Sequence, residues 1–340
     1  MKVDEKKTAA AAPAAGAAPA NRRSPWLSFA LRRLAGLGAV LVTLVTVTFL
    51  IVQMIPGDPA RVLAGPDAGP AEIEQARVRL GLDQPLIQQF ASYVGGLLRG
   101  DLGTSFATGE PVTAIITSRL PFTAELAFLA ILVVLLVAVP LGMTIAIACR
   151  GGRRRRLSTG FTFGTSLAGA VPEYILGTLL VLVFAIMLGV LPAAGAETPT
   201  ALILPVLAVA VAPICTLARI VRRETATVLA QDYMRTARGK RLPGLTLYTR
   251  HALPNLLTST LTLGGLILAH MLGGTIIVES VFAWPGLGTR VVEAILNRDY
   301  PVIQGVVLTL GVIATLLNLL IDVLLGVLDP RTLTGKADRP

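Results

Sequence analysis

The sequence predicts an all-α fold, a polytopic bundle of six transmembrane helices over residues 34–330. Only 15% of the 340 residues are charged and 54% are hydrophobic, whereas a soluble domain of this length carries about a quarter charged residues. The mean hydropathy is +0.72, and long uncharged runs alternate with short basic stretches. Because a helix needs about 20 apolar residues to cross a bilayer, each long run is a candidate span.

Six runs are long enough to cross the hydrocarbon core at about 1.5 Å rise per residue. Their expected ranges, in chain order, are 35–55, 121–150, 162–190, 198–218, 252–278 and 300–327. Proline is tolerated inside membrane helices, so we expect Pro140, Pro172 and Pro205 to kink these helices rather than end them.

Two tails and two long loops complete the predicted organisation. Residues 1–33 form a basic tail in which the Ala/Pro-rich stretch 8–20 is expected to be disordered, and 331–340 form a second tail. The loop 56–119 is expected to contain helices at 70–82, where Pro comes first and acids precede bases, and at 85–98, where apolar residues have helical spacing. The loop 221–254 has room for two short helices.

The distribution of basic residues predicts the orientation. An even number of spans places both termini on one side of the membrane. Of the 30 Lys and Arg residues, 23 fall in the two tails, in the run RGGRRRR (150–156) and in the stretch from Arg219 to Arg250 that follows the fourth span. Since cytoplasmic loops are enriched in Lys and Arg, both termini are expected in the cytoplasm. This bias explains the net charge of +10 better than nucleic-acid binding does, and it suggests that RGGRRRR serves mainly orientation.

The sequence offers no catalytic or metal centre. Cys149 and Cys215 lie in apolar runs and are predicted to be small buried thiols rather than a disulfide. The two histidines, His251 and His270, are far apart, so no metal site is expected. A Walker A motif is absent, because neither Gly-Lys pair follows the required Gly or precedes Ser or Thr. The chain itself is therefore not expected to bind ATP.

Eight short segments occur in order along the chain. They are PGDP (56–59), RLGLDQPL (79–86), GGLLRGDLGTSF (95–106), QDYMRTAR (231–238), RHALPN (250–255), LGG with VESVFAWPGLG (272–288), RDYP (298–301) and DPR (329–331). With them, residues 31–331 resemble the permease subunits of ATP-binding cassette (ABC) importers for dipeptides and oligopeptides, a group that also includes nickel and glutathione permeases.

The resemblance implies a type I ABC importer permease fold and an assembly in the cytoplasmic (inner) membrane. It implies four kinds of partner for this chain: a second homologous permease, two ATP-binding cassette ATPase subunits, an extracytoplasmic solute-binding protein and a peptide substrate. ATP and Mg would be held by the ATPase subunits, with no cofactor in this chain. Import of nickel, glutathione or another small solute is the alternative within the family. An ion-gradient secondary transporter is the remote alternative, because no internal repeat of broken helices is found.

The resemblance also implies a coupling helix that seats on the ATPase, followed by a helix through His251. The coupling residues that match are Asp232, Tyr233, Arg235, Thr236, Ala237, Arg238, Gly239, Lys240 and Arg241. Ala237 is expected to nest against the partner. Arg241 stands where the family usually has the Gly that ends this helix in a left-handed conformation. The alternative is that these charges only face solvent.

Ionisable and polar residues at membrane depth are candidates for the translocation pathway. They are Glu173, His270, Glu279, Asn318 and Asp322, and for each a purely structural contact remains open. Four further residues are candidates for an external surface facing the binding protein, namely Asp101, Trp284, Pro285 and Gly286. Trp284 is equally suited to anchor the chain at the membrane interface.

Overall fold

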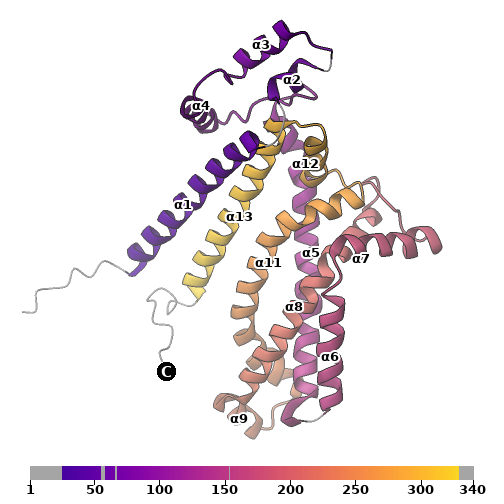
Figure 1. The fold of residues 1–340 in the computed structure, drawn as a ribbon. Helices are drawn as coiled ribbons and strands as arrows, with labels where there is room; N and C mark the ends of the chain where they lie inside the picture. Colours follow the sequence, from indigo (N-terminus) through magenta and orange to yellow (C-terminus); the bar gives the residue numbers. More distant parts are fainter. Residues whose placement is uncertain (1–24, 55–57, 66, 153, 329–340) are drawn as a thin grey trace, which may run out of the picture.

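The computed structural model describes residues 25–54, 58–65, 67–152 and 154–328, and nearly all of its ordered elements are helices (Figure 1). The described residues contain no named strand. The α-helices are α1 (Pro25–Met54), α2 (Pro59–Ala64), α3 (Pro70–Arg79), α4 (Leu86–Leu98), α5 (Val112–Ala148), α6 (Arg155–Ala168), α7 (Glu173–Leu180), α8 (Ile203–Ala230), α9 (Asp232–Gly239), α10 (Gly244–Thr246), α11 (Leu253–Val281), α12 (Leu287–Leu296) and α13 (Tyr300–Leu328). Two π-helical stretches continue α7 and precede α11, at Val181–Met187 and Leu247–Ala252.

The predicted number of six spans agrees with the helices if two bent pairs each count as one span. Four helices are long and apolar enough on their own, namely α1, α5, α8 with its preceding turn, and α13. In the first bent pair, α6 is followed at an angle of 89° by α7 and its π-helical continuation. The second bent pair is α11 itself, whose two halves meet at an angle of 51°.

The third span differs from the prediction of a single kinked helix. The first helix, α6, ends at Ala168, and α7 begins only at Glu173, directly after Pro172. The break thus covers residues 169–172, and Pro172 directly precedes α7; because proline lacks an N–H, it cannot donate to the Ala168 carbonyl and continue the helix across the junction. In Figure 1, α6 stands beside α5 and α8, whereas α7 leads sideways away from them.

Two other helices are longer than predicted. The second span, α5, begins at Val112, nine residues before the expected start, and contains both Pro121 and Pro140. Its early residues Ile115 and Ile116 are buried in a cluster with α12 and α13, which explains the added length. The fourth span, α8, has Pro205 in its first turn, where proline is compatible with a helix, and continues to Ala230 into the predicted loop 221–254.

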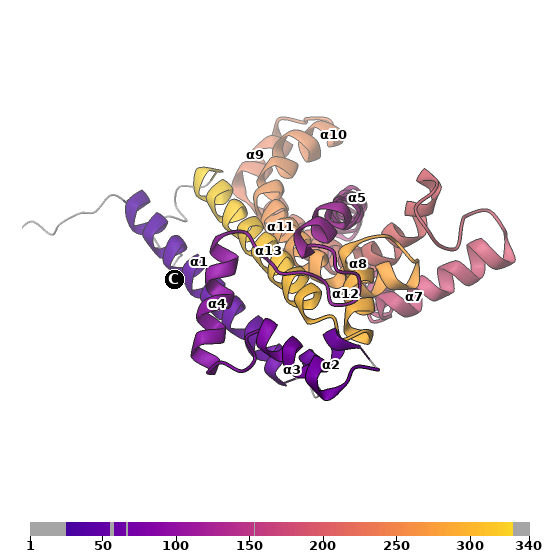
Figure 2. The ribbon, with the colours of Figure 1, turned by 90° about the horizontal axis from the view of Figure 1, so that it is seen from above.

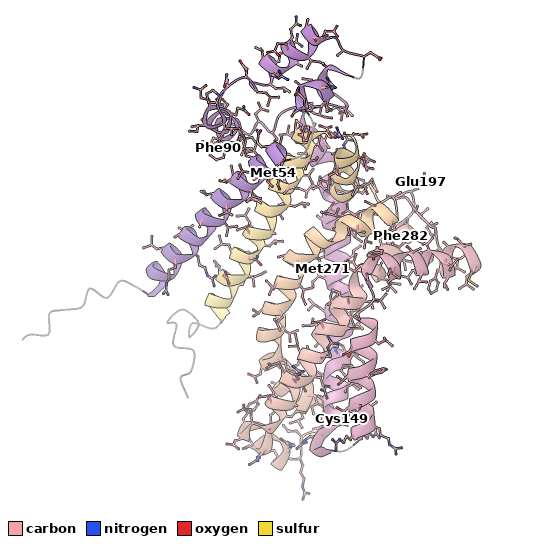
Figure 3. The ribbon with its side chains drawn as sticks, viewed as in Figure 1. Met54, Phe90, Cys149, Glu197, Met271 and Phe282 are labelled. Atoms are coloured by element: carbon pink, nitrogen blue, oxygen red, sulfur yellow. The ribbon has the colours of Figure 1, made fainter. Side chains whose placement is uncertain are left out.

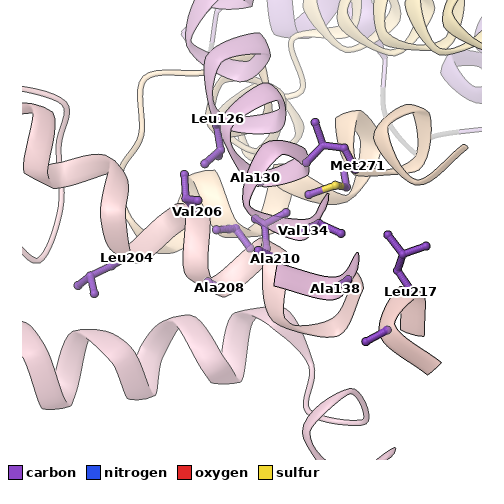
Figure 4. Close-up of a cluster of buried hydrophobic side chains, with 14 of the residues drawn as sticks. Leu126, Ala130, Val134, Ala138, Leu204, Val206, Ala208, Ala210, Leu217 and Met271 are labelled. Atoms are coloured by element: carbon purple, nitrogen blue, oxygen red, sulfur yellow. The ribbon is translucent and has the colours of Figure 1, made fainter. Parts of the chain in front are cut away.

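The core lies where α5, α8 and α11 meet, with Leu126, Val134 and Met271 among its side chains (Figure 4). Small residues let the helices approach closely. A Cβ atom placed on Gly142 of α5 would lie 2.6 Å from the carbonyl oxygen of Ala218 in α8. Close contact at small residues is typical of helix packing in membranes, where lipid tails offer no hydrophobic driving force.

The two ends of the bundle are distinct. Arg33 of α1 forms an ion pair of 2.6 Å with Asp322 of α13, so the start of α1 and the end of α13 lie together. Figure 3 places Cys149 at the end that carries α9, and Met54 and Phe90 at the opposite end. From above, α2, α3 and α4 lie beside the upper ends of α1, α13 and α12 (Figure 2). The two helices expected in the loop 56–119 are thus present as α3 and α4.

Candidate functional site

The predicted coupling helix exists as α9 and has one buried and one exposed side. Met234 and Ala237, three residues apart, are buried in a cluster with residues that precede and follow the helix: Leu229, Leu247 and Ala252. The exposed residues are Asp232, Tyr233, Arg235, Thr236, Gly239 and Lys240. Because positions three apart share a helix face, the burial of Met234 and Ala237 leaves the opposite side of α9 open to a partner.

The structure contradicts the expected role of Ala237. Only 7% of this residue is exposed, and it packs on its own chain rather than on a surface that a partner could reach. The small side chain allows α9 to lie across the end of α8 and the segment that leads into α11. A partner that binds α9 would therefore contact its exposed residues.

Hydrogen bonds fix α9 to the helices on either side. The Arg238 guanidinium donates to the carbonyl oxygens of Met234 at 2.9 Å and Leu229 at 2.6 Å, and so covers the end of α8. At the opposite side, Asn255 Nδ2 donates to the Tyr233 hydroxyl at 2.9 Å. The segments QDYMRTAR and RHALPN thus meet in space, and α9 is hydrogen-bonded to both α8 and α11.

Arg241 takes over the conformation that a glycine would adopt. Its φ is +54°, and its N–H donates to the Arg238 carbonyl at 2.9 Å just after α9 ends. The turn is therefore where the resemblance places it, but a side chain with a Cβ occupies the left-handed region, which is costly for residues other than glycine.

Three of the five predicted pathway residues line one open cavity of about 710 Å³. Glu173 comes from the start of α7, His270 from α11 and Asn318 from α13. Apart from these groups and Thr216 of α8, the walls are mostly apolar, with Leu266, Ile267, Ala269, Met271 and Ala314 among them. A cavity with a few polar groups in apolar walls is typical of a site for a small organic ligand.

The other two predicted pathway residues lie elsewhere. Asp322 pairs with Arg33 and borders a separate, smaller cavity between α1 and α13. Glu279 is fully buried, and its Oε2 accepts the Gly288 N–H at 2.6 Å. A Cβ on Gly286 would approach the same oxygen to 2.3 Å, so the glycines of this loop are required by the carboxylate that they enclose. Glu279 thus stabilises the connection between α11 and α12 through the hydrogen bond that it accepts from Gly288, and it does not line the cavity.

The segment expected to face a binding protein is largely turned inward. Trp284 is 2% exposed, and its Nε1–H donates to the Phe122 carbonyl at 3.0 Å. Gly286 is buried and Pro285 is half-buried. Trp284 is therefore neither an interfacial anchor nor an outward contact, because α5 covers it. Asp101 is exposed as expected, and its Oδ1 accepts the N–H of Gly103 at 2.8 Å.

Sequence reasoning missed the role of Asp299. This residue is 1% exposed, and its carboxylate accepts the Phe106 N–H at 3.0 Å and the Ser105 hydroxyl. It therefore joins the segments GGLLRGDLGTSF and RDYP at the end of the bundle that carries α2, α3 and α4. The available signal was an acid directly before the Tyr-Pro pair that opens α13, a position that favours negative charge.

Comparison with known proteins gives consistent matches over nearly the whole chain. The family described as binding-protein-dependent transport system inner membrane component matches residues 138–334, and the N-terminal region of such membrane components matches residues 26–127. A putative peptide transport system permease protein of Brucella abortus is 39% identical over 309 residues, which cover 88% of this chain and 97% of the relative. The glutathione transport system permease protein GsiC of Salmonella choleraesuis is 40% identical over 305 residues, covering 89% and 98%.

A solved structure shares the fold. The MetNI methionine ABC transporter in an inward-facing conformation superposes with a TM-score of 0.54 at 15% identity, over 64% of this chain and 97% of the matched chain.

Proposed function

This chain belongs to the family of binding-protein-dependent transport system inner membrane components, and we propose that it is the membrane-spanning subunit of an ATP-driven peptide importer. The expected ABC importer permease fold is confirmed. The observation that carries the proposal is the cavity in the membrane-spanning part, lined by Glu173, His270 and Asn318. A peptide offers an ammonium group, amides and a carboxylate, and these three side chains provide a matching anion, imidazole and amide.

The energy for transport comes from partners in this proposal. Because the sequence has no Walker A motif, two ATPase subunits bind ATP and Mg, and the exposed side of α9 is the surface that they move. A second permease subunit completes the membrane pathway, and a solute-binding protein delivers the peptide at the end that carries α2, α3 and α4. The similarity to GsiC supports a tripeptide such as glutathione as a second candidate substrate.

The proposed orientation places α9 and both termini in the cytoplasm. Cysteines at Ala107 and Lys240, both exposed and at opposite ends of the bundle, distinguish the two sides. In a variant lacking Cys149 and Cys215, a membrane-impermeant thiol reagent applied to intact cells is expected to label position 107 but not position 240. Labelling of position 240 from outside would contradict the orientation.

The transport function is tested by reconstitution. The chain, its second permease and the two ATPases are placed in proteoliposomes with the binding protein, and uptake of a radiolabelled tripeptide is measured with and without ATP. We expect Glu173→Gln to lower uptake at least about tenfold, since it removes the charge that pairs with the ammonium group. The control Glu197→Gln removes an exposed acid outside the cavity and is expected to leave uptake unchanged. Ion-gradient-driven uptake by this chain alone would overturn the proposal.

A further inference from the structure

A second cavity, of about 650 Å³, lies at the same end of the bundle as α9. It is bordered by the turn between α5 and α6, by α8 and by α9. No Asp or Glu of the described residues lines it. Six arginines do, namely Arg150, Arg155, Arg222, Arg223, Arg235 and Arg238.

Two of the six arginines, Arg222 and Arg238, are held in place by hydrogen bonds within the chain. Arg222 Nη1 donates to Ser158 Oγ at 2.7 Å, and its guanidinium carbon lies 5.9 Å from the centre of the Phe161 ring. The Nε–H of Arg222 is buried without a hydrogen-bond partner among the described residues. A buried donor without an acceptor is costly, so an acceptor from outside the chain, such as an anion or water, would be stabilised there.

The start of α6 adds to the positive potential of this cavity. The helix begins at Arg155 with no side-chain cap and no acidic residue in its first turn, so its first N–H groups lack side-chain acceptors. Gly151, Gly152 and Arg154, in the connection between α5 and α6, all have left-handed φ values of 52° to 77°. A helix N-terminus favours an anion, as the arginines do.

We propose that this cavity binds a phosphate group, carried either by the headgroup of an anionic phospholipid of the inner leaflet or by a soluble phosphate compound. Guanidinium forks match phosphate oxygens, and a basic pocket between helices on the cytoplasmic side is suited to acidic lipid headgroups. The lipid source depends on the orientation that the proposed function assigns, whereas the phosphate chemistry does not. Because the cavity joins α6, α8 and α9, its occupant would link the lipid surface to the coupling helix.

The test measures binding to the purified full-length chain, so that it is independent of transport. The chain in neutral detergent is titrated by calorimetry with dioctanoyl phosphatidylglycerol, with dioctanoyl phosphatidylcholine and with inorganic phosphate. We expect saturable binding of phosphatidylglycerol, weaker binding at higher salt, and no binding of phosphatidylcholine. The double variant R150Q/R155Q removes two exposed arginines that have no hydrogen bond or ion pair within the described chain, and it is expected to weaken binding about 30-fold.

The control is R154Q/R156Q, which removes two exposed charges from the same turn outside the cavity lining and is expected to change the affinity less than about threefold. Phosphatidylglycerol binding that depends on Arg150 and Arg155 supports the lipid source, and inorganic phosphate binding that depends on them supports the soluble source. If neither probe binds the wild type, or if R150Q/R155Q binds both as tightly as the wild type, the proposal is wrong. In that case the arginines serve orientation or contact a partner's acidic residues.

Discussion

The substitution Thr236→Arg separates contact with a partner from packing within the chain. Thr236 is exposed on α9, and its hydroxyl donates only to the Asp232 carbonyl, at 3.2 Å within the same helix. An arginine there lies one turn from Asp232, an arrangement that favours the helix, so the free energy of unfolding should change by less than about 0.5 kcal/mol. If the exposed side of α9 seats in an ATPase, the new guanidinium is buried there without a partner. That costs about 3–5 kcal/mol and weakens association by at least about a hundredfold.

The matched variant is Ala237→Asp on the buried side of the same helix. Its carboxylate would enter the cluster with Met234 and Leu247, so folding itself should lose several kcal/mol. Three measurements distinguish the two variants: thermal unfolding of the purified chain, co-purification of the ATPase subunits, and ATP-dependent uptake. Thr236→Arg should keep its Tm and lose the other two, whereas Ala237→Asp should also lose Tm. Wild-type ATPase association and uptake in Thr236→Arg would refute the assignment of this side of α9 to the ATPase.

Three further changes probe individual contacts. Arg241→Gly removes the Cβ from a left-handed residue and should raise the free energy of unfolding by about 1 kcal/mol in thermal unfolding, a gain that would be absent if the turn were unstrained. Gly286→Ala should lower the free energy of unfolding by about 1–3 kcal/mol, because the new Cβ would meet the Glu279 carboxylate. The control Gly273→Ala, which has open space around the new Cβ, should leave the free energy of unfolding unchanged. Arg77, at 2.6 Å, holds the pKa of the Asp58 carboxyl below its usual value. The stabilisation that the Arg77–Asp58 ion pair gives to the α2–α3 contact is therefore present above about pH 4, and it is lost as the pH falls through the lowered pKa of Asp58. Limited proteolysis of α2 and α3 should show this acid sensitivity in the wild type and not in Asp58→Asn.

Local sequence determined which segments cross the membrane. The expected spans 35–55 and 300–327 correspond to α1 and α13, and the two helices expected in the loop 56–119 are α3 and α4. These features depend on the mean apolarity of a run and on helix-start signals, both of which are properties of neighbouring residues. The predicted boundaries outside the described residues, at 1–24, 55–57 and 329–340, remain predictions.

Contacts between distant segments decided whether a proline kinks a helix or ends it. The helical structure is interrupted between Ala168 and Glu173, next to Pro172, whereas Pro121 and Pro140 lie within the continuous α5. Next to the break, a Cβ on Gly169 would lie 3.2 Å from the Cβ of Cys215 in α8, and one on Gly177 would lie 3.1 Å from the Phe282 ring at the end of α11. The two sides of the break thus pack closely on different helices, an arrangement that a proline by itself does not specify.

The sequence by itself determined the family, the spans and the position of the short helix α9, because each depends on local composition or on motifs that can be compared directly. The tertiary structure alone decided the directions of the side chains. Ala237 faces inward because α8 and the segment before α11 cover it, and Trp284 is buried because α5 lies over it. Glu173, His270 and Asn318 share a cavity only because α7, α11 and α13 converge. A side chain's surroundings are set by elements far away in the chain, and no local pattern contains that information.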